Sequence, residues 1–133
     1  MRRDVYLRMV GDCYDHLPNE ACGLVAGVAP KSDDATADVC YPITNAAGSS
    51  RVYELDPREH LRADRDAEDN GLQLLGVYHS HTHTVGYPSP TDVAAAPDPA
   101  WHYVLVSFAD EAPSVRSYRI VDGNISEEPV VVV

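Results

Sequence analysis

The spacing of apolar and polar positions predicts a chain in which helices alternate with short strands. The first 17 residues repeat apolar side chains every three or four positions, the period of an amphipathic helix, and Pro18 ends it. The apolar positions of this helix are Val5, Met9, Cys13 and Leu17. The continuous apolar run over residues 21–28 predicts a buried strand, and the polar residues 30–36 after it predict a turn.

Two further strands are predicted before the middle of the chain, over residues 39–44 and 51–55. A second helix begins directly after them, because Asp56 is a capping residue, Pro57 suits the first helical position and Glu59 completes a capping box. We expect this helix to run to about residue 69. Most of its side chains are charged, so it should lie on the surface.

The second half of the chain predicts the centre of a sheet. An apolar run over residues 72–81 predicts a central strand, and residues 89–96 a short helix. Residues 101–108 and 114–121 predict a hairpin across 110–113, whereas 129–133 are either an edge strand or a loose end. Together these elements predict a single α/β domain over residues 1–133, with a central mixed β-sheet flanked by about three helices.

Charge and composition narrow the classes of function. The formal net charge is −11, which disfavours nucleic acid as a partner because phosphate would be repelled. No apolar run is long enough to cross a membrane and the charged N-terminus does not resemble a signal peptide, so we expect a cytoplasmic protein. Three cysteines, Cys13, Cys22 and Cys40, argue against a disulfide framework, and none forms a Cys-x-x-Cys pair.

The candidate chemistry lies in His79-Ser80-His81, followed after seven residues by Ser89-Pro90-Thr91-Asp92. Residues two apart on a strand face the same side, so His79 and His81 present two imidazoles together. The intervening loop is long enough to bring Asp92 back as a third ligand from the first turn of a helix. Two imidazoles and a carboxylate suit zinc, and three protein ligands leave a fourth position open for water, as in catalytic sites.

Each part of this pattern also has a purely structural explanation. Ser89 to Asp92 is an ordinary capping box with proline at the first helical position. A His-x-His pair also arises by chance, and His83 continues the alternation as a rival ligand, although we expect it in the loop. The other histidines, interpreted as surface or core residues, are His16, His60 and His102.

Hydrolysis also needs a group that takes a proton from water and passes it to the leaving amine. Glu20 is the best candidate, because it lies between the first helix and a buried apolar strand; a solvated loop glutamate is the alternative. Ser89 is a candidate hydrogen-bond donor to the oxyanion, with a helix cap as its alternative. Cys22 lies two residues from Glu20, so its role as a buried apolar residue is less certain.

Taken together, Glu20, His79-x-His81, Ser89 and Asp92 at this spacing resemble the motif of the JAMM (MPN+, Mov34/PAD-1) metalloproteases at all five positions. The likeness covers nearly the whole chain and is similar to the bacterial branch of the family. It implies the JAMM α/β fold, related to cytidine deaminases, although the deaminase signature His-x-Glu with Pro-Cys-x-x-Cys is absent. It also implies one Zn²⁺ per chain on His79, His81 and Asp92.

The resemblance implies an activity as well. Bacterial members act on ubiquitin-fold sulfur-carrier proteins ending in Gly-Gly and release cysteine from the carrier by hydrolysing an amide, with Glu20 as general acid/base and Ser89 stabilising the oxyanion. In a short chain we expect the Gly-Gly tail to bind in a groove beside the metal, for instance by pairing with a sheet edge. The alternatives are a deconjugase for another ubiquitin-like tag or peptide, and a non-catalytic MPN scaffold.

Overall fold

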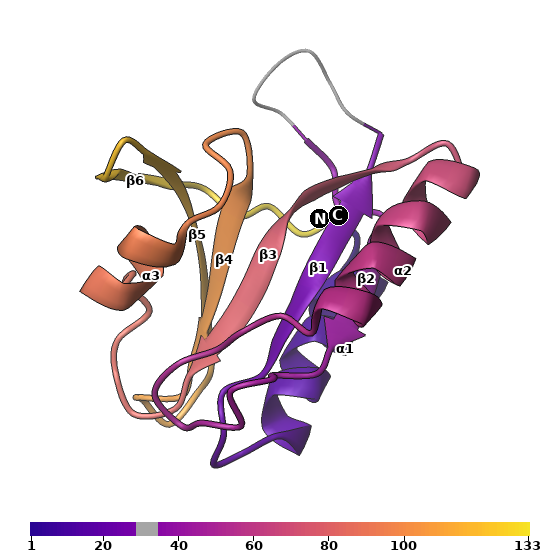
Figure 1. Ribbon diagram of the computed structural model, residues 1–133. Helices are drawn as coiled ribbons and strands as arrows, with labels where there is room; N and C mark the ends of the chain where they lie inside the picture. The colour runs from indigo at the N-terminus through magenta and orange to yellow at the C-terminus, as the bar shows by residue number, and fades with distance from the viewer. Residues whose placement is uncertain (29–34) are drawn as a thin grey trace.

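A mixed β-sheet forms the centre of the computed structural model, which describes residues 1–28 and 35–133 (Figure 1). Its strand order is β2-β1-β3-β4-β5-β6, and only the central pair β3 and β4 is parallel. The strands are β1 (Cys22–Gly27), β2 (Val39–Ile43), β3 (Gln73–His81), β4 (His102–Ser107), β5 (Ser114–Val121) and β6 (Asn124–Glu128). The helices are α1 (Arg3–Asp15), α2 (Pro57–Asp69) and α3 (Pro90–Ala95). The predicted α/β class is confirmed.

The two faces of the sheet carry separate apolar clusters. In Figure 1, α1 lies behind the sheet and α2 in front of it. On the α1 face, Val5, Met9 and Cys13 pack with Tyr78 and other strand residues. The front face packs Ala63 of α2 against strand residues from β1 to β5, namely Cys22, Leu24, Val77, Tyr103, Leu105, Tyr118 and Ile120. The successive β3 residues Val77 and Tyr78 therefore belong to opposite cores, as the alternation of side chains along a strand requires.

The two long helices follow the sequence prediction with two differences. Leu17, assigned to the apolar stripe of α1, lies beyond the helix end and is 40% exposed. Asp56 caps α2 by accepting hydrogen bonds from the backbone N–H groups of Arg58 and Glu59. Glu59, however, does not complete a capping box, because its carboxylate accepts hydrogen bonds from Thr44 instead. The side chain of Glu59 thus ties the start of α2 to the end of β2.

The prediction of a strand over residues 51–55 is wrong. Only Leu55 forms a β-bridge there, to Asn45. The side chain of Asn45 explains the difference, because it hydrogen-bonds the carbonyl of Val52 and the N–H of Glu54. These backbone groups are satisfied by a side chain rather than by a neighbouring strand, so alternation in the sequence does not produce a ladder.

Of the two alternatives for residues 129–133, an edge strand or a loose end, the strand does not form. Residues 129–133 are not a strand, and β6 over Asn124–Glu128 pairs with β5 instead. Asp122 and Gly123 join the two strands, and both have positive φ, 51° and 78°. Asp-Gly in such a two-residue turn is a strong hairpin signal that the prediction overlooked. The predicted turn over residues 30–36 falls mostly outside the described residues.

The remaining predictions concern cysteines and membrane spans. Cys13, Cys22 and Cys40 are free and buried, so the structure contains them as small core residues. Among the described residues, no helix is both long and apolar enough to cross a bilayer.

Candidate active site

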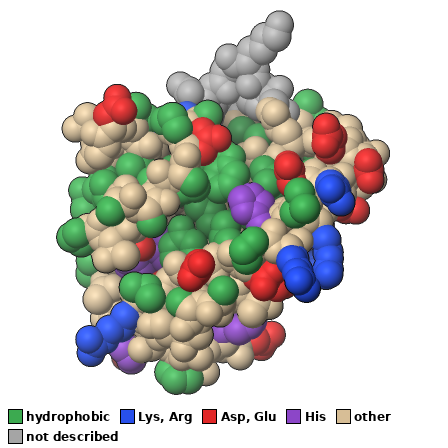
Figure 2. All heavy atoms as spheres, in the orientation of Figure 1, with side chains coloured by type: hydrophobic (Ala, Val, Ile, Leu, Met, Phe, Trp, Pro, Cys, Tyr) green, Lys and Arg blue, Asp and Glu red, His purple; other side chains and the backbone are tan. Residues whose placement is uncertain are grey.

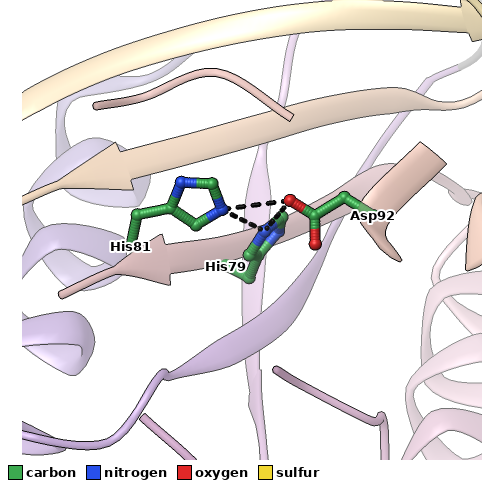
Figure 3. A group of neighbouring side chains, drawn as sticks. All are labelled: His79, His81 and Asp92. Atoms are coloured by element: carbon green, nitrogen blue, oxygen red, sulfur yellow. Dashed lines mark hydrogen bonds and ion pairs between the residues drawn. The ribbon is translucent and has the colours of Figure 1, made fainter. Parts of the chain in front are cut away.

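Three candidate ligands meet at the carboxyl end of β3 (Figure 3). His79 and His81 occupy alternate positions of this strand and point to the side of the sheet that α2 covers. Both are buried, with 3% and 5% exposure. Figure 3 shows Asp92 directed at both rings from α3. Its Oδ2 atom lies 3.2 Å from Nε2 of His79 and 3.0 Å from Nε2 of His81.

The first turn of α3 fixes the direction of Asp92. Ser89 is the N-cap of this helix, and its Oγ accepts a hydrogen bond from the Asp92 N–H at 3.1 Å. The carboxylate of Asp92 in return accepts the Ser89 N–H at 2.9 Å through Oδ2. Pro90 at the first helical position presets the backbone for this turn. The capping-box prediction is confirmed, and the box leaves Oδ2 facing the imidazoles.

The spacing of the three donor atoms fits one zinc ion. The two Nε2 atoms lie 3.2 Å apart, so all three separations fall between 3.0 and 3.2 Å. Ligands bound at about 2.0–2.1 Å in a tetrahedron would be about 3.3 Å from one another. Among the described residues, no fourth His, Cys, Asp or Glu joins the group. A tetrahedral ion held here would keep one position for water or substrate.

The protonation of His81 also favours a cation at this point. Its Nδ1 lies 2.9 Å from the carbonyl oxygen of Val85, which can only accept, so Nδ1 carries a proton. In the neutral ring Nε2 is then an acceptor, yet it faces the acceptor Oδ2 of Asp92. Either a second proton or a metal ion must lie between them. Neutral imidazole with Nδ1–H bonded to a carbonyl is the usual state of a metal-binding histidine.

The pKa directions in this group follow from burial and from the shared carboxylate. Burial lowers the pKa of His79, and the nearby Asp92 opposes this shift only in part. Burial also acts downward on His81, but its hydrogen bonds to Asp92 and to the Val85 carbonyl raise its pKa on balance. The pKa of Asp92 lies far below its ordinary value, since hydrogen bonds from both histidines outweigh burial. Asp92 is therefore an anion at every physiological pH.

Glu20 comes to this group through the register of β1 on β3. Cys22 pairs with His79, and one residue further along the Ser80 N–H donates to the Ala21 carbonyl oxygen while the Ala21 N–H donates to the side-chain Oγ of Ser80. The next residue, Glu20, therefore lies opposite His81. It is 3% exposed, so the solvated-loop alternative does not hold. Among the described residues, its Oε1 atom is buried with no hydrogen-bond partner.

The environment of Glu20 makes its carboxyl a weaker acid than that of an ordinary glutamate. Burial raises its pKa from 4.5 to about 7; the positive charge of His81 opposes this rise and the negative charge of Asp92 adds to it. A carboxyl with a pKa near neutrality can both accept and return a proton under ordinary conditions. A carboxylate oxygen that has no hydrogen-bond partner in the described part of the chain and a metal-sized donor cluster thus share one buried corner of the fold.

The other candidates lie outside this group. His83 is exposed in the loop, and His102 is paired with Glu128 on β6. His16 follows α1 and lies beside Asp12, while His60 on α2 packs against Trp101. Cys22 is adjacent to His79 across the strand pair, but its Sγ lies 3.6 Å from the carbonyl oxygen of Ile43 and does not join the candidate ligand group that the described residues form.

Two residues near the site carried no signal in the sequence. The ring of Tyr53 stacks on that of His79, with centroids 4.2 Å apart and planes at 24°. Asn45 donates a hydrogen bond to the carbonyl oxygen of Glu20 at 3.0 Å. Both lie in the connection between β2 and α2, and their relation to the site exists only in the folded chain.

The sequence profile of the prokaryotic homologs of the JAB domain matches residues 2–121. The chain belongs to this family. The resemblance to the JAB/MPN (JAMM) family drawn from the sequence is thereby confirmed. The chain is 46% identical to the CysO-cysteine peptidase of Mycobacterium tuberculosis over 134 residues, which cover all of this chain and 90% of that protein.

Two further similarities agree with this assignment. A desampylase of Haloferax volcanii is 38% identical over 91 residues, covering 68% of this chain and 63% of that protein. The solution structure of a protein from Desulfitobacterium hafniense superposes with a TM-score of 0.90 at 34% identity, covering 100% of this chain and 93% of the other. The mycobacterial relative is named as a peptidase, which supports a hydrolase.

Proposed function

We propose that this chain is a zinc metallopeptidase that hydrolyses the amide between cysteine and the C-terminal Gly-Gly of a ubiquitin-fold sulfur-carrier protein. The observation that carries the proposal is the convergence of His79, His81 and Asp92 within hydrogen-bond distance of one another beside the buried Glu20. The end-to-end similarity to a CysO-cysteine peptidase supports the choice of substrate.

Each residue of the site has a separate role in the proposed hydrolysis. His79, His81 and Asp92 would hold the zinc ion, which would supply Lewis acidity and lower the pKa of a water molecule to about 7. Glu20 takes a proton from the attacking water and returns it to the amine nitrogen as the C–N bond breaks. Ser89 uses its Oγ lone pair to accept the Asp92 N–H, so its hydroxyl hydrogen is free to donate to the substrate carbonyl oxygen as charge develops there.

A hydrophobic hollow lies on the face of the sheet that also carries the site. Figure 2 shows hydrophobic side chains gathered between α3 and α2, over the middle strands of the sheet, where the surface is hollowed. Trp101, Leu74 and Val93 are among the partly buried residues packed on the core of this face. A Gly-Gly tail has no side chains to clash with flanking helices and can approach a buried metal closely.

The desampylase similarity favours a second candidate within the same chemistry. An enzyme that removes another ubiquitin-like tag from a lysine side chain would use the same ligands and the same proton carrier. The two functions differ in the amine that leaves, cysteine in one and a lysine ε-amine in the other. A non-catalytic scaffold is the third possibility, but it would have no use for a buried Glu20 without a hydrogen-bond partner among the described residues.

A substrate comparison tests the proposal. The purified protein, loaded with one equivalent of zinc, is incubated with a Gly-Gly carrier bearing a C-terminal cysteine and, separately, with the same carrier joined to a lysine side chain. We expect the mass of the cysteine adduct to fall by one cysteine residue, and chelation to prevent it. Faster cleavage of the lysine conjugate would favour the deconjugase, and cleavage of neither would reject both.

A further inference from the structure

The two histidines of the site are oriented in different ways. Nδ1 of His81 is fixed by the carbonyl oxygen of Val85 at 2.9 Å. For His79, Nδ1 is buried and makes no hydrogen bond to any of the described residues. Histidines that bind metals usually donate this second N–H to a carbonyl or carboxylate, which sets the plane of the ring and which nitrogen is free. Because Nδ1 of His79 makes no such bond within residues 1–28 and 35–133, another contact must help to set the plane of the ring.

Tyr53 supplies the contact that His79 otherwise lacks. Its ring lies almost parallel to the imidazole, with 4.2 Å between centroids and 24° between planes. The other aromatic contact of His79 is the edge of His81, at 5.0 Å and 63°. Rotation of His79 out of its present plane would therefore drive it into the tyrosine ring on one side. Aromatic rings in this arrangement attract one another beyond the apolar area that they bury.

The side chain of Asn45 holds both the segment that contains Tyr53 and the backbone of Glu20. The side-chain amide of Asn45 donates to the carbonyl oxygens of Glu20 and Val52, and its oxygen accepts the N–H of Glu54. These bonds fix the residues on both sides of Tyr53. The N–H of Glu20 also donates to the carbonyl of Ser49 at 2.8 Å. One irregular connection thus anchors both the proton carrier and the residue that packs on a metal ligand.

We propose that Tyr53 is a positioning residue that holds the His79 ring in its metal-binding plane by stacking, in place of a hydrogen bond to Nδ1. The inference rests on the proposed metal site. It differs from a general packing role, because it assigns the effect to the aromatic face and not to the hydroxyl or to the volume of the side chain. Phenylalanine at position 53 should therefore preserve the orientation of the His79 ring, whereas an aliphatic residue should not.

The test measures zinc affinity by competition with a chromophoric chelator in wild type, Tyr53→Phe and Tyr53→Leu. We expect Tyr53→Phe to stay within about threefold of wild type and Tyr53→Leu to bind zinc about 10- to 100-fold more weakly, the range found when outer contacts of metal ligands are removed. Cobalt-loaded Tyr53→Leu should also show a changed visible spectrum. Tyr14→Leu is the control, because the ring of Tyr14 packs at a tilt against Phe108, with centroids 4.6 Å apart, and not on a candidate ligand.

The outcomes separate this inference from the proposed function. Wild type that binds no zinc rejects the metal site itself. Wild-type affinity and an unchanged cobalt spectrum in Tyr53→Leu reject the role of Tyr53 alone, and so does an equal loss in Tyr53→Phe. Circular dichroism checks that each variant is folded. If Tyr53→Leu does not fold, Tyr53→Met takes its place under the same criteria, since its flexible chain fills the space without an aromatic face.

Discussion

Ser89 and Asp92 exchange hydrogen bonds across the first turn of α3, each accepting the backbone N–H of the other. The same pair lies at the candidate active site, where Asp92 also contacts both histidines. One short motif therefore starts a helix of six residues and directs a carboxylate into a buried cluster. The same hydrogen bonds cap the helix and position the candidate ligand Asp92, so the structural and the functional explanations of this motif hold together.

Replacement of Ser89 by alanine should affect activity far more than stability. Loss of the cap should lower the free energy of unfolding by about 0.5–2 kcal/mol. Loss of an oxyanion donor should lower kcat by about 10²- to 10³-fold. Asp56→Ala is the control, because the side chain of Asp56 also caps a helix by accepting backbone N–H groups but belongs to α2. Steady-state kinetics and urea unfolding of both variants would contradict this account if their kcat values fell equally.

The raised pKa of Glu20 predicts how the stability of chelator-treated protein depends on pH. Its pKa is about 7 in the folded chain, because of burial, against an ordinary value of 4.5. Between these values the unfolded chain loses the proton while the folded chain keeps it, so stability falls as pH rises through this window. The cost is complete above pH 7, on the order of 1–3 kcal/mol.

Glu20→Gln isolates that contribution, since glutamine does not titrate. In urea unfolding with chelator present, we expect the variant to gain stability relative to wild type between pH 5 and pH 8. Protons taken up by His79 and His81 affect both proteins and largely cancel in the difference. An unchanged difference at the two pH values would mean that Glu20 ionises normally in the folded protein.

Gly76 keeps the strand that carries both histidines close to its parallel neighbour. A Cβ atom at this position would lie 2.0 Å from the backbone oxygen of His102 on β4. Because backbone cannot move aside as a flexible side chain can, Gly76→Ala should lower the free energy of unfolding by about 1–3 kcal/mol or more. Gly11→Ala in α1 is the control, since nothing lies within 4 Å of the added atom. Equal thermal midpoints for the two variants would refute this.

Local patterns were sufficient to predict most elements of the fold. Periodicity identified α1, β1, β3 and the β4–β5 hairpin, and the caps at Asp56 and Ser89 fixed the starts of α2 and α3. The failure at residues 51–55 has a nonlocal cause, because the Asn45 side chain takes backbone bonds that a strand would use. The missed β6 was predictable from Asp122-Gly123.

The sequence motif was sufficient to predict the candidate ligands but not the environment around them. The spacing of His79, His81 and Asp92 places three candidate ligands on one strand end and one helix start, and the structure brings their donor atoms together. The burial of Glu20 depends on strand register and on the connection after β2, which no local pattern encodes. The contact of Tyr53 with His79 arises from the same connection and had no sequence signal. The catalytic roles of Glu20 and Ser89 stay predictions.

Native mass spectrometry during zinc titration is the strongest test of the metal site, because it counts ions per folded chain. We expect one zinc ion on the wild-type chain and on Glu20→Gln, and none on His81→Ala at the same free zinc concentration. Wild type that takes up no zinc, or His81→Ala that takes up as much as wild type, would contradict it.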